Sequence, residues 1–267
     1  MLEKVKYIVA IASGKGGVGK STTAVNTALA LQSLGQSVGL LDADIYGPSI
    51  AMMLGVPEDQ RPEVADEKFF KPVMAHGLAT MSMAYLTTEK TPMVWRGPMA
   101  AGALQQLLQQ TQWGELDVLV VDMPPGTGDI QLTLSQKAQI SGAVIVTTPQ
   151  DIALLDAKKG IEMFVKVKIP VLGIVENMAT HICSQCGFEE SIFGVGGGEL
   201  VANQYNTQLL GSLPLDRSIR EHGDSGNPLS TSETTLEITA SYLEIAKRLA
   251  AELEHSSSNA SPEIVFE

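Results

Sequence analysis

Apolar runs of strand length alternate with segments whose apolar positions recur at helical spacing through most of the 267 residues. The predicted buried strands are residues 5–12, 37–42, 116–122, 143–147, 171–176 and 208–213. Each run is nearly continuous in apolar residues, which is typical of parallel strands covered on both faces. The pattern therefore predicts an α/β fold, a doubly wound and mostly parallel sheet with helices on both faces.

Helical spacing predicts five helices between and after these strands. They are residues 23–34, 100–110, 151–168, a segment from Glu199, and a segment from the N-cap Ser232 to about 254. Residues 55–91 carry three prolines and only short apolar pieces, so we expect a surface excursion with short strands there. We expect a single domain over residues 1–254 and a mobile, serine-rich tail over residues 255–267.

Composition and charge exclude several classes of partner. The longest apolar runs are far shorter than a membrane helix needs, and Lys4 and Lys6 lead straight into a strand, so we expect a cytoplasmic protein with no signal peptide. The net charge of −12 argues against nucleic acid as a partner. The last predicted helix closes on residues 251–254 without a basic amphipathic face, which disfavours membrane binding.

A glycine-rich loop at residues 13–22 separates the first predicted strand from the first helix. Gly14, Gly19, Lys20 and Ser21 fit G-x-x-x-x-G-K-[ST], in which backbone N–H groups surround a phosphate at a helix N-terminus. In this pattern the lysine reaches the outer phosphates and the hydroxyl binds Mg²⁺. We expect a P-loop ATPase whose nucleotide contacts are Gly14, Lys15, Gly16, Gly17, Val18, Gly19, Lys20, Ser21 and Thr22.

Lys15 adds a second lysine to a loop in which Lys20 already serves the phosphates. At this residue the loop resembles that of the deviant Walker A ATPases, the class that includes MinD, ParA and nitrogenase iron protein. The resemblance implies that each Lys15 crosses a twofold axis to the partner's nucleotide, and therefore a homodimer. A solvated lysine is the alternative.

Acidic residues end two of the predicted strands. Asp122 follows a buried apolar run, the Walker B arrangement, and would hold the water shell of Mg²⁺ opposite Ser21. Asp44 is the candidate that polarises the attacking water, while Asp42 supports the loop or the metal's water shell; a turn rich in Asp, Gly and Pro is the alternative. The predicted catalytic residues are Lys15, Lys20, Asp44 and Asp122.

Three further positions complete the predicted nucleotide site. Gly126 lies in a Gly- and Pro-rich segment, 123–129, where a backbone N–H can approach the γ-phosphate and move once that phosphate leaves. The resemblance to the deviant Walker A class implies that Asn177 reads the adenine edge, with a turn residue as the alternative. Pro214, in the segment 213–216, is the expected second wall of the base pocket.

Cys183 and Cys186 are the only cysteines and form a C-x-x-C pair within a predicted metal-binding loop at residues 177–190. The spacing lets two thiolates face one metal centre, yet zinc or an iron-sulfur cluster needs about four ligands. A twofold dimer would bring two such pairs together. A structural zinc shared across a dimer and a redox pair are alternatives, and His181 is a further candidate ligand.

Five segments together resemble the Mrp/ApbC family of iron-sulfur carrier ATPases, over roughly residues 5 to 250. They are residues 14–21, 42–49, 95–98, 122–129 and 183–186. The resemblance implies a homodimer that binds ATP and Mg²⁺, hydrolyses ATP slowly, holds a shared [4Fe-4S] cluster through Cys183 and Cys186, and passes it from a donor to apo-proteins. Many bacterial members have a small domain before the ATPase, which we expect to be absent here.

Two other functions remain open at this point. A MinD- or ParA-like positioning ATPase with a structural zinc would use the same loop, and a reductase like nitrogenase iron protein would use cysteines that are not spaced as C-x-x-C. Arg96, before the predicted helix at 100–110, contacts the nucleotide region or a partner subunit, or is solvated.

Overall fold

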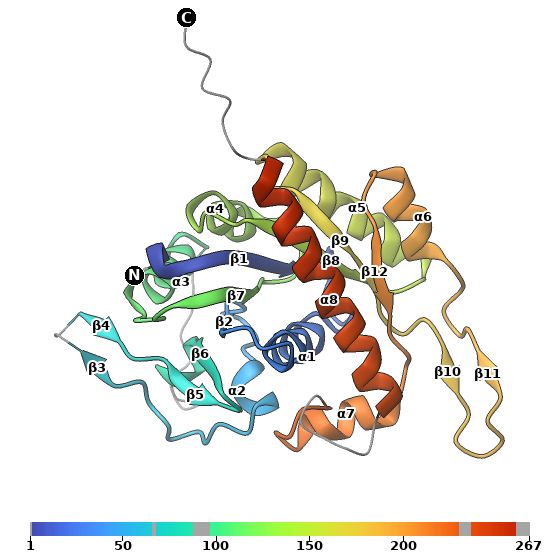
Figure 1. The fold of residues 1–267 in the computed structure, drawn as a ribbon, viewed down its shortest axis with the longest axis horizontal. Coiled ribbons are helices and arrows are strands. Elements are labelled where there is room, and N and C mark those ends of the chain that lie inside the picture. Colours follow the sequence, from blue (N-terminus) through green and yellow to red (C-terminus); the bar gives the residue numbers. More distant parts are fainter. Residues whose placement is uncertain (1, 66–67, 88–96, 230–235, 260–267) are drawn as a thin grey trace, which may run out of the picture.

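An eight-stranded sheet forms the centre of the protein in the computed structural model, which describes residues 2–65, 68–87, 97–229 and 236–259 (Figure 1). The strand order is β12-β9-β8-β1-β7-β2-β6-β5, and every neighbouring pair is parallel except β5 with β6. The strands are β1 Val5–Ala12, β2 Val38–Asp42, β5 Val73–Ala75, β6 Leu78–Ser82, β7 Leu116–Asp122, β8 Gly142–Thr147, β9 Val171–Glu176 and β12 Leu209–Ser212.

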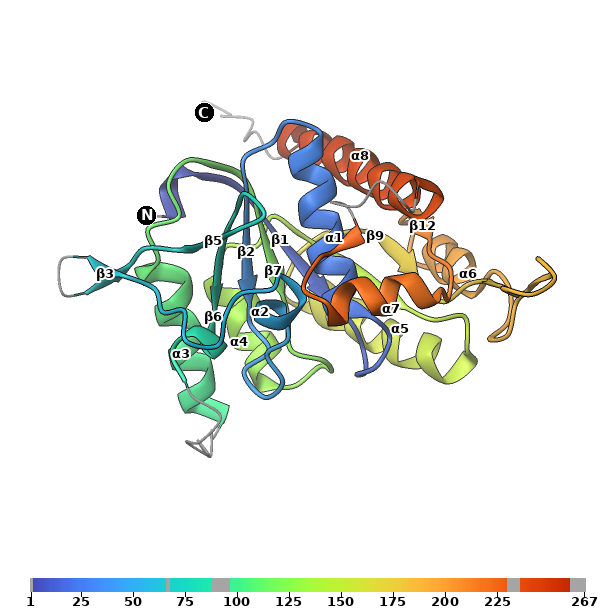
Figure 2. The ribbon, with the colours of Figure 1, turned by 90° about the horizontal axis from the view of Figure 1, so that it is seen from below.

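Helices cover both faces of this sheet, as Figure 2 shows. One apolar cluster joins α1 and α8 to one face, and a second joins α3, α4, α5 and α6 to the other. The helices are α1 Lys20–Ser33, α2 Ile50–Met53, α3 Gly97–Gln110, α4 Asp129–Lys137, α5 Asp151–Lys166, α6 Gly197–Gln204, α7 Arg217–Asp224 and α8 Leu236–Asn259. The prediction of a doubly wound, mostly parallel sheet is confirmed.

All six predicted strands are present, with bounds that differ from the prediction by at most one residue. Two small hairpins lie outside the main sheet: β3 Val64–Ala65 with β4 Phe69–Phe70, and β10 His181–Ile182 with β11 Glu189–Glu190. The second hairpin carries the cysteine pair and projects beside β12 at the edge of the sheet (Figure 1).

The interpretation of residues 55–91 as a surface excursion is wrong for β6. This strand is buried throughout and pairs in parallel with β2 inside the main sheet. Thr80 and Ser82 hide it in the sequence, because their polar side chains interrupt the apolar pattern. Both hydroxyls are satisfied in the interior: Thr80 donates to the Val73 carbonyl and Ser82 donates to Asp42.

The C-terminal helix is longer than predicted, since α8 runs to Asn259 through part of the segment that was expected to be a mobile tail. Residues 260–267, the predicted cap Ser232 and Arg96 lie outside the described residues. Across the described segments, the helices lack the combination of length and apolar character that a bilayer crossing requires.

Candidate nucleotide and metal sites

The glycine-rich loop turns sharply between β1 and α1 because Gly17 and Gly19 adopt positive φ angles of 79° and 84°. The loop also packs tightly against α5. A Cβ atom on Gly14 would lie 2.0 Å from the backbone oxygen of Asp156, whereas one on Gly16 would meet nothing within 4 Å. The two glycines therefore serve different purposes: Gly14 permits close packing, and Gly16 leaves open space above the loop.

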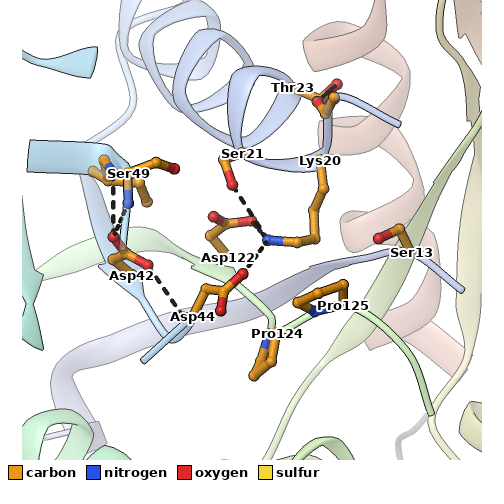
Figure 3. A network of polar contacts seen from close by, with 12 residues as sticks. Ser13, Lys20, Ser21, Thr23, Asp42, Asp44, Ser49, Asp122, Pro124 and Pro125 are labelled. Carbon is orange, nitrogen blue, oxygen red and sulfur yellow. Dashed lines mark hydrogen bonds and ion pairs between the residues drawn. The ribbon is translucent and has the colours of Figure 1, made fainter. Parts of the chain in front are cut away.

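Lys20 is the centre of a buried polar network at the start of α1 (Figure 3). Its ammonium donates to Asp122 Oδ1 at 2.6 Å and to Ser21 Oγ at 3.3 Å, and lies 3.9 Å from Asp44 Oδ2. Three of the four predicted catalytic residues are thus in direct contact or ion-pair range. The fourth, Lys15, lines the same cavity and has no ion-pair partner within the described part of the chain.

Asp122 lies at the carboxyl end of β7, where the register pairs it with Ile11 of β1 and Asp42 of β2. Burial raises the pKa of its carboxyl, and the adjacent Lys20 opposes this shift. Its Oδ2 atom is buried without a hydrogen-bond partner among the described residues. Mg²⁺ prefers oxygen ligands such as carboxylates. The oxygens of Asp122, Ser21 and Asp44 surround the Lys20 ammonium, so these three residues fit a magnesium site.

Asp42 has a different environment from Asp44, although only one residue separates them. Asp42 is buried, and its carboxylate accepts hydrogen bonds from the backbone N–H groups of Asp44, Ser49 and Ile50 and from the Ser82 hydroxyl. Burial, reinforced by the charge of Asp122, raises the pKa of Asp42 to about 7. Asp42 therefore stabilises the loop after β2 through these hydrogen bonds, whereas Asp44 lines the cavity.

A cavity of about 440 Å³ opens beside this network. The predicted site residues that line it are Lys15, Gly16, Gly17, Gly19, Lys20, Ser21, Thr22, Asp44, Asn177 and Pro214. Ser13, Pro125, Leu215 and Asp216, which lie in segments predicted to form the site, line it as well. The lining residues outside those segments are Ser49, Met52, Met53, Met178, Ile219, Arg220, Gly223 and Asp224. The cavity thus lies between the glycine-rich loop, α2 and α7.

Helix α7 is the main part of this wall that the sequence analysis missed. Its eight residues carry too few apolar positions to give a helical pattern. The available indication was Asp216, whose side chain accepts from the Ser218 N–H and caps the helix. Ile219, Arg220 and Asp224 of this helix line the cavity.

Three of the predicted nucleotide contacts, Asn177, Val18 and Gly126, make contacts within the protein. The Asn177 side-chain amide donates to the Val18 carbonyl at 2.9 Å, and its Nδ2 atom lies so close to Gly19 that a Cβ there would be 2.0 Å away. Val18 is buried in the core below α1. The Gly126 N–H, expected at the γ-phosphate, donates to the Ser13 carbonyl at 3.0 Å. Asn177 and Gly126 thus brace the phosphate loop in this structure.

The cysteine pair lies in the turn of the β10–β11 hairpin, apart from the cavity lining. The Cys183 N–H donates to the Phe188 carbonyl, and the Gly187 N–H donates to the Cys183 carbonyl at 2.8 Å. Gly187 has a φ of 70°, which suits glycine at the tight end of the turn. Both thiols are free; Cys183 is half-buried and Cys186 is exposed.

The turn favours a thiolate at Cys183. Backbone N–H groups of Gln185 and Cys186 donate to its sulfur and lower its pKa, with smaller contributions from the Cys186 side chain and the charge of His181. Within the described residues, no group of three His, Cys, Asp or Glu side chains is placed to hold a metal ion. One chain therefore offers two thiols, and any tetrahedral centre needs further ligands from elsewhere.

Comparisons with known proteins agree with this site. The family described as ParA: NUBPL iron-transfer P-loop NTPase matches residues 4–250. The chain is 62% identical over 245 residues to the iron-sulfur cluster carrier protein of Pseudomonas fragi, covering 92% of this chain and 85% of that protein. It is 50% identical over 257 residues to the mouse iron-sulfur cluster transfer protein NUBPL, covering 96% and 80%.

Among solved structures, a nucleotide-binding protein from Archaeoglobus fulgidus in complex with ADP superposes with a TM-score of 0.77. It shares 37% sequence identity, and the match covers 89% of this chain and 93% of that one. The family match spans both the glycine-rich loop and the cysteine hairpin. The chain therefore belongs to the ParA-related family of NUBPL iron-transfer P-loop NTPases.

Proposed function

We propose that this protein is an ATP-binding and ATP-hydrolysing iron-sulfur cluster carrier, in which two chains hold one [4Fe-4S] cluster and deliver it to apo-proteins. The cluster is the cargo, received from a donor. Two free thiols suit a reducing compartment such as the cytoplasm.

The cysteine hairpin carries this proposal. It presents two thiols at the surface, lowers the pKa of one of them, and supplies too few ligands for a closed metal site. A closed structural zinc site has four protein ligands, and the described part of one chain brings no three candidate ligands together. An exposed half-site instead fits a labile centre completed by the Cys183 and Cys186 thiolates of a second chain, because such a centre opens when the chains separate.

The residues around Lys20 supply the nucleotide chemistry in this proposal. Lys20 binds the outer phosphates, while Ser21 and Asp122 hold Mg²⁺, which neutralises charge on the phosphates when bound. Asp44 orients the attacking water, since it lines the cavity beside Lys20, whereas Asp42 and Asp122 do not line it. Lys15, which lacks an ion-pair partner in the described part of its own chain, reaches the nucleotide of the partner chain.

The walls of the cavity hold the base in this proposal. Asn177 reads the adenine edge through its Oδ1 atom, while one of its two amide hydrogens is donated to the Val18 carbonyl. Pro214 and α7 form the opposite wall. The Pseudomonas fragi and mouse relatives, named for cluster carriage and transfer, and the Archaeoglobus relative in complex with ADP, support the two halves of the proposal.

A transfer assay tests the function. The protein is loaded anaerobically with iron and sulfide and mixed with an apo-protein that needs a [4Fe-4S] cluster for activity, with a chelator present to trap released iron. We expect the acceptor to become active. Cys183→Ala should abolish delivery yet still bind ATP, and Lys20→Ala should abolish ATP turnover while cluster loading survives.

The alternative function, a positioning ATPase with a structural zinc shared across a dimer, gives a different result. The protein would then stay colourless after reconstitution, retain zinc, and leave the acceptor inactive. Loss of nucleotide binding in Cys183→Ala would also contradict the division of labour between the two sites.

A further inference from the structure

We propose that His181 is a positioning residue that couples the nucleotide cavity to the cysteine hairpin. The inference rests on the proposed function for its purpose, but it is argued from contacts that hold whatever the thiols bind. His181 lies two residues before Cys183, at the start of β10. Its Nδ1 atom lies 3.1 Å from the carbonyl oxygen of Leu215, which lines the cavity.

A ladder of hydrogen bonds leads from the cavity wall to this histidine. The chain after β9 and the chain after β12 run side by side: Leu213 N–H donates to Glu176, Ala179 N–H to Leu213, and Leu215 N–H to Thr180, at 2.9, 2.9 and 2.7 Å. The His181 contact with Leu215 is the next bond of the series. It is also the one made by a side chain, so a substitution removes it without altering the backbone.

The direction of this last bond is determined by its acceptor. A carbonyl oxygen only accepts, so Nδ1 of His181 carries the hydrogen and donates it. The imidazole is thereby held by the wall of the cavity while its backbone forms the first pair of the hairpin, His181 with Glu190. A shift of Leu215 therefore moves the strand that leads directly into Cys183.

The other end of the same segment is fixed to the phosphate loop. Asn177 donates to the Val18 carbonyl, and Met178, which also lines the cavity, has a φ of 57°, a left-handed conformation that is uncommon for a side chain of this size. Residues 177–181 are thus linked to the cavity at both ends, since Asn177 and Met178 line it and His181 is bonded to Leu215, which lines it. A nucleotide that presses on Leu215 or on the start of α7 thus acts on the segment that carries the thiols.

Thiol reactivity tests this coupling without any metal. Free-thiol protein is alkylated with iodoacetamide in the absence and presence of saturating Mg·ADP, and the rate is followed by mass spectrometry. For the natural sequence we expect the rate to change about fivefold on nucleotide binding, a typical size for coupling between sites. In His181→Ala the rate should no longer respond, while the affinity for ADP stays within about twofold.

Two further variants separate coupling from a merely structural effect. His181→Asn retains an N–H donor near the same position and should restore most of the response. Ser218→Ala removes a hydroxyl that donates to Asp216 in the cavity wall but makes no bond to the hairpin, so its response should match the natural sequence.

The proposal is overturned if nucleotide leaves the thiol rate of the natural sequence unchanged, if His181→Ala responds like the natural sequence, or if His181→Ala simply loses ADP binding. If nucleotide slows alkylation only because two chains associate and cover the thiols, His181→Ala will respond like the natural sequence. Failure of the carrier function would appear separately, as a protein whose thiols respond to ADP but which binds no cluster.

Discussion

Two buried aspartates at the ends of neighbouring strands are stabilised in different ways. Asp122 has the ammonium of Lys20 at 2.6 Å, whereas the hydrogen bonds of Asp42 come from three backbone N–H groups and a hydroxyl. Burial, together with the nearby charge of Asp122, raises the pKa of Asp42 to about 7, and the hydrogen bonds from its backbone N–H partners oppose this shift only in part. Loss of the Asp42 proton near neutral pH therefore acts on the loop after β2, whose backbone N–H groups donate to this carboxyl.

Asp42 should make the unfolding free energy depend on pH between about 4 and 7. Its carboxyl binds a proton more tightly in the folded chain than at its usual pKa of 3.8, so its stabilising contribution is complete below pH 4 and is lost as pH rises to 7. From pH 5.5 to 7.0 the natural protein should lose about 2 kcal/mol relative to Asp42→Asn, which does not titrate.

Urea unfolding of both proteins at several pH values provides the measurement. The quantity to compare is the difference between the two unfolding free energies at each pH, because titrating groups that do not interact with Asp42 contribute equally to both proteins. A difference that stays constant from pH 5.5 to 7.5 would show that Asp42 is already ionised in the folded protein at the lower pH.

At the scale of elements, the phosphate loop depends on its contact with α5 as well as on its own glycines. Gly14 lies against the backbone oxygen of Asp156, and a Cβ at this position would be 2.0 Å from that atom. Gly160, also on α5, faces Gly14: a Cβ on Gly160 would lie 3.8 Å from the Gly14 nitrogen. The close approach of two backbones leaves no flexible side chain that could move aside.

Gly14→Ala should therefore destabilise the fold by about 3 kcal/mol, the upper range for overpacking a tight contact. Gly16→Ala is the matched control two residues away, where a Cβ meets nothing within 4 Å and φ is not positive, so its effect on stability should stay within about 0.5 kcal/mol. Denaturant midpoints measure both. Equal destabilisation by the two variants would refute the role of the α5 contact.

The elements that sequence could predict are those with continuous apolar runs. The strands at 116–122 and 171–176 were predicted with their observed bounds, because parallel strands covered on both faces need apolar residues at almost every position. Strand β6 was expected only as a short surface strand, because the hydroxyls of Thr80 and Ser82 interrupt its apolar pattern and are satisfied in the interior. Helix α7 was missed because it is short and mostly polar.

At the scale of the whole molecule, the sequence predicted both sites but not the connection between them. The loop at 13–22 and the C-x-x-C pair are recognisable because their chemistry needs specific residue types at fixed spacing. The bond from His181 to Leu215 joins residues 34 apart in sequence, and only the pairing of β9 with β12 brings them together. Such a contact leaves no local pattern.

The two sites have different requirements for a second chain. Residues of one chain line the cavity, and only the crossing role proposed for Lys15 involves a second chain. The cysteine hairpin, in contrast, offers only two of about four ligands that a cluster needs. We therefore propose that the metal centre, and not the fold, requires two chains.

The most direct test is the stoichiometry of the reconstituted protein, measured by native mass spectrometry together with iron and sulfide analysis. We predict a species of two chains with a single cluster, about four irons and four sulfides per pair of chains, which disappears in Cys183→Ala while the variant still binds ATP. A complete cluster bound to one chain, or a dimer that holds zinc and no sulfide, would contradict the account.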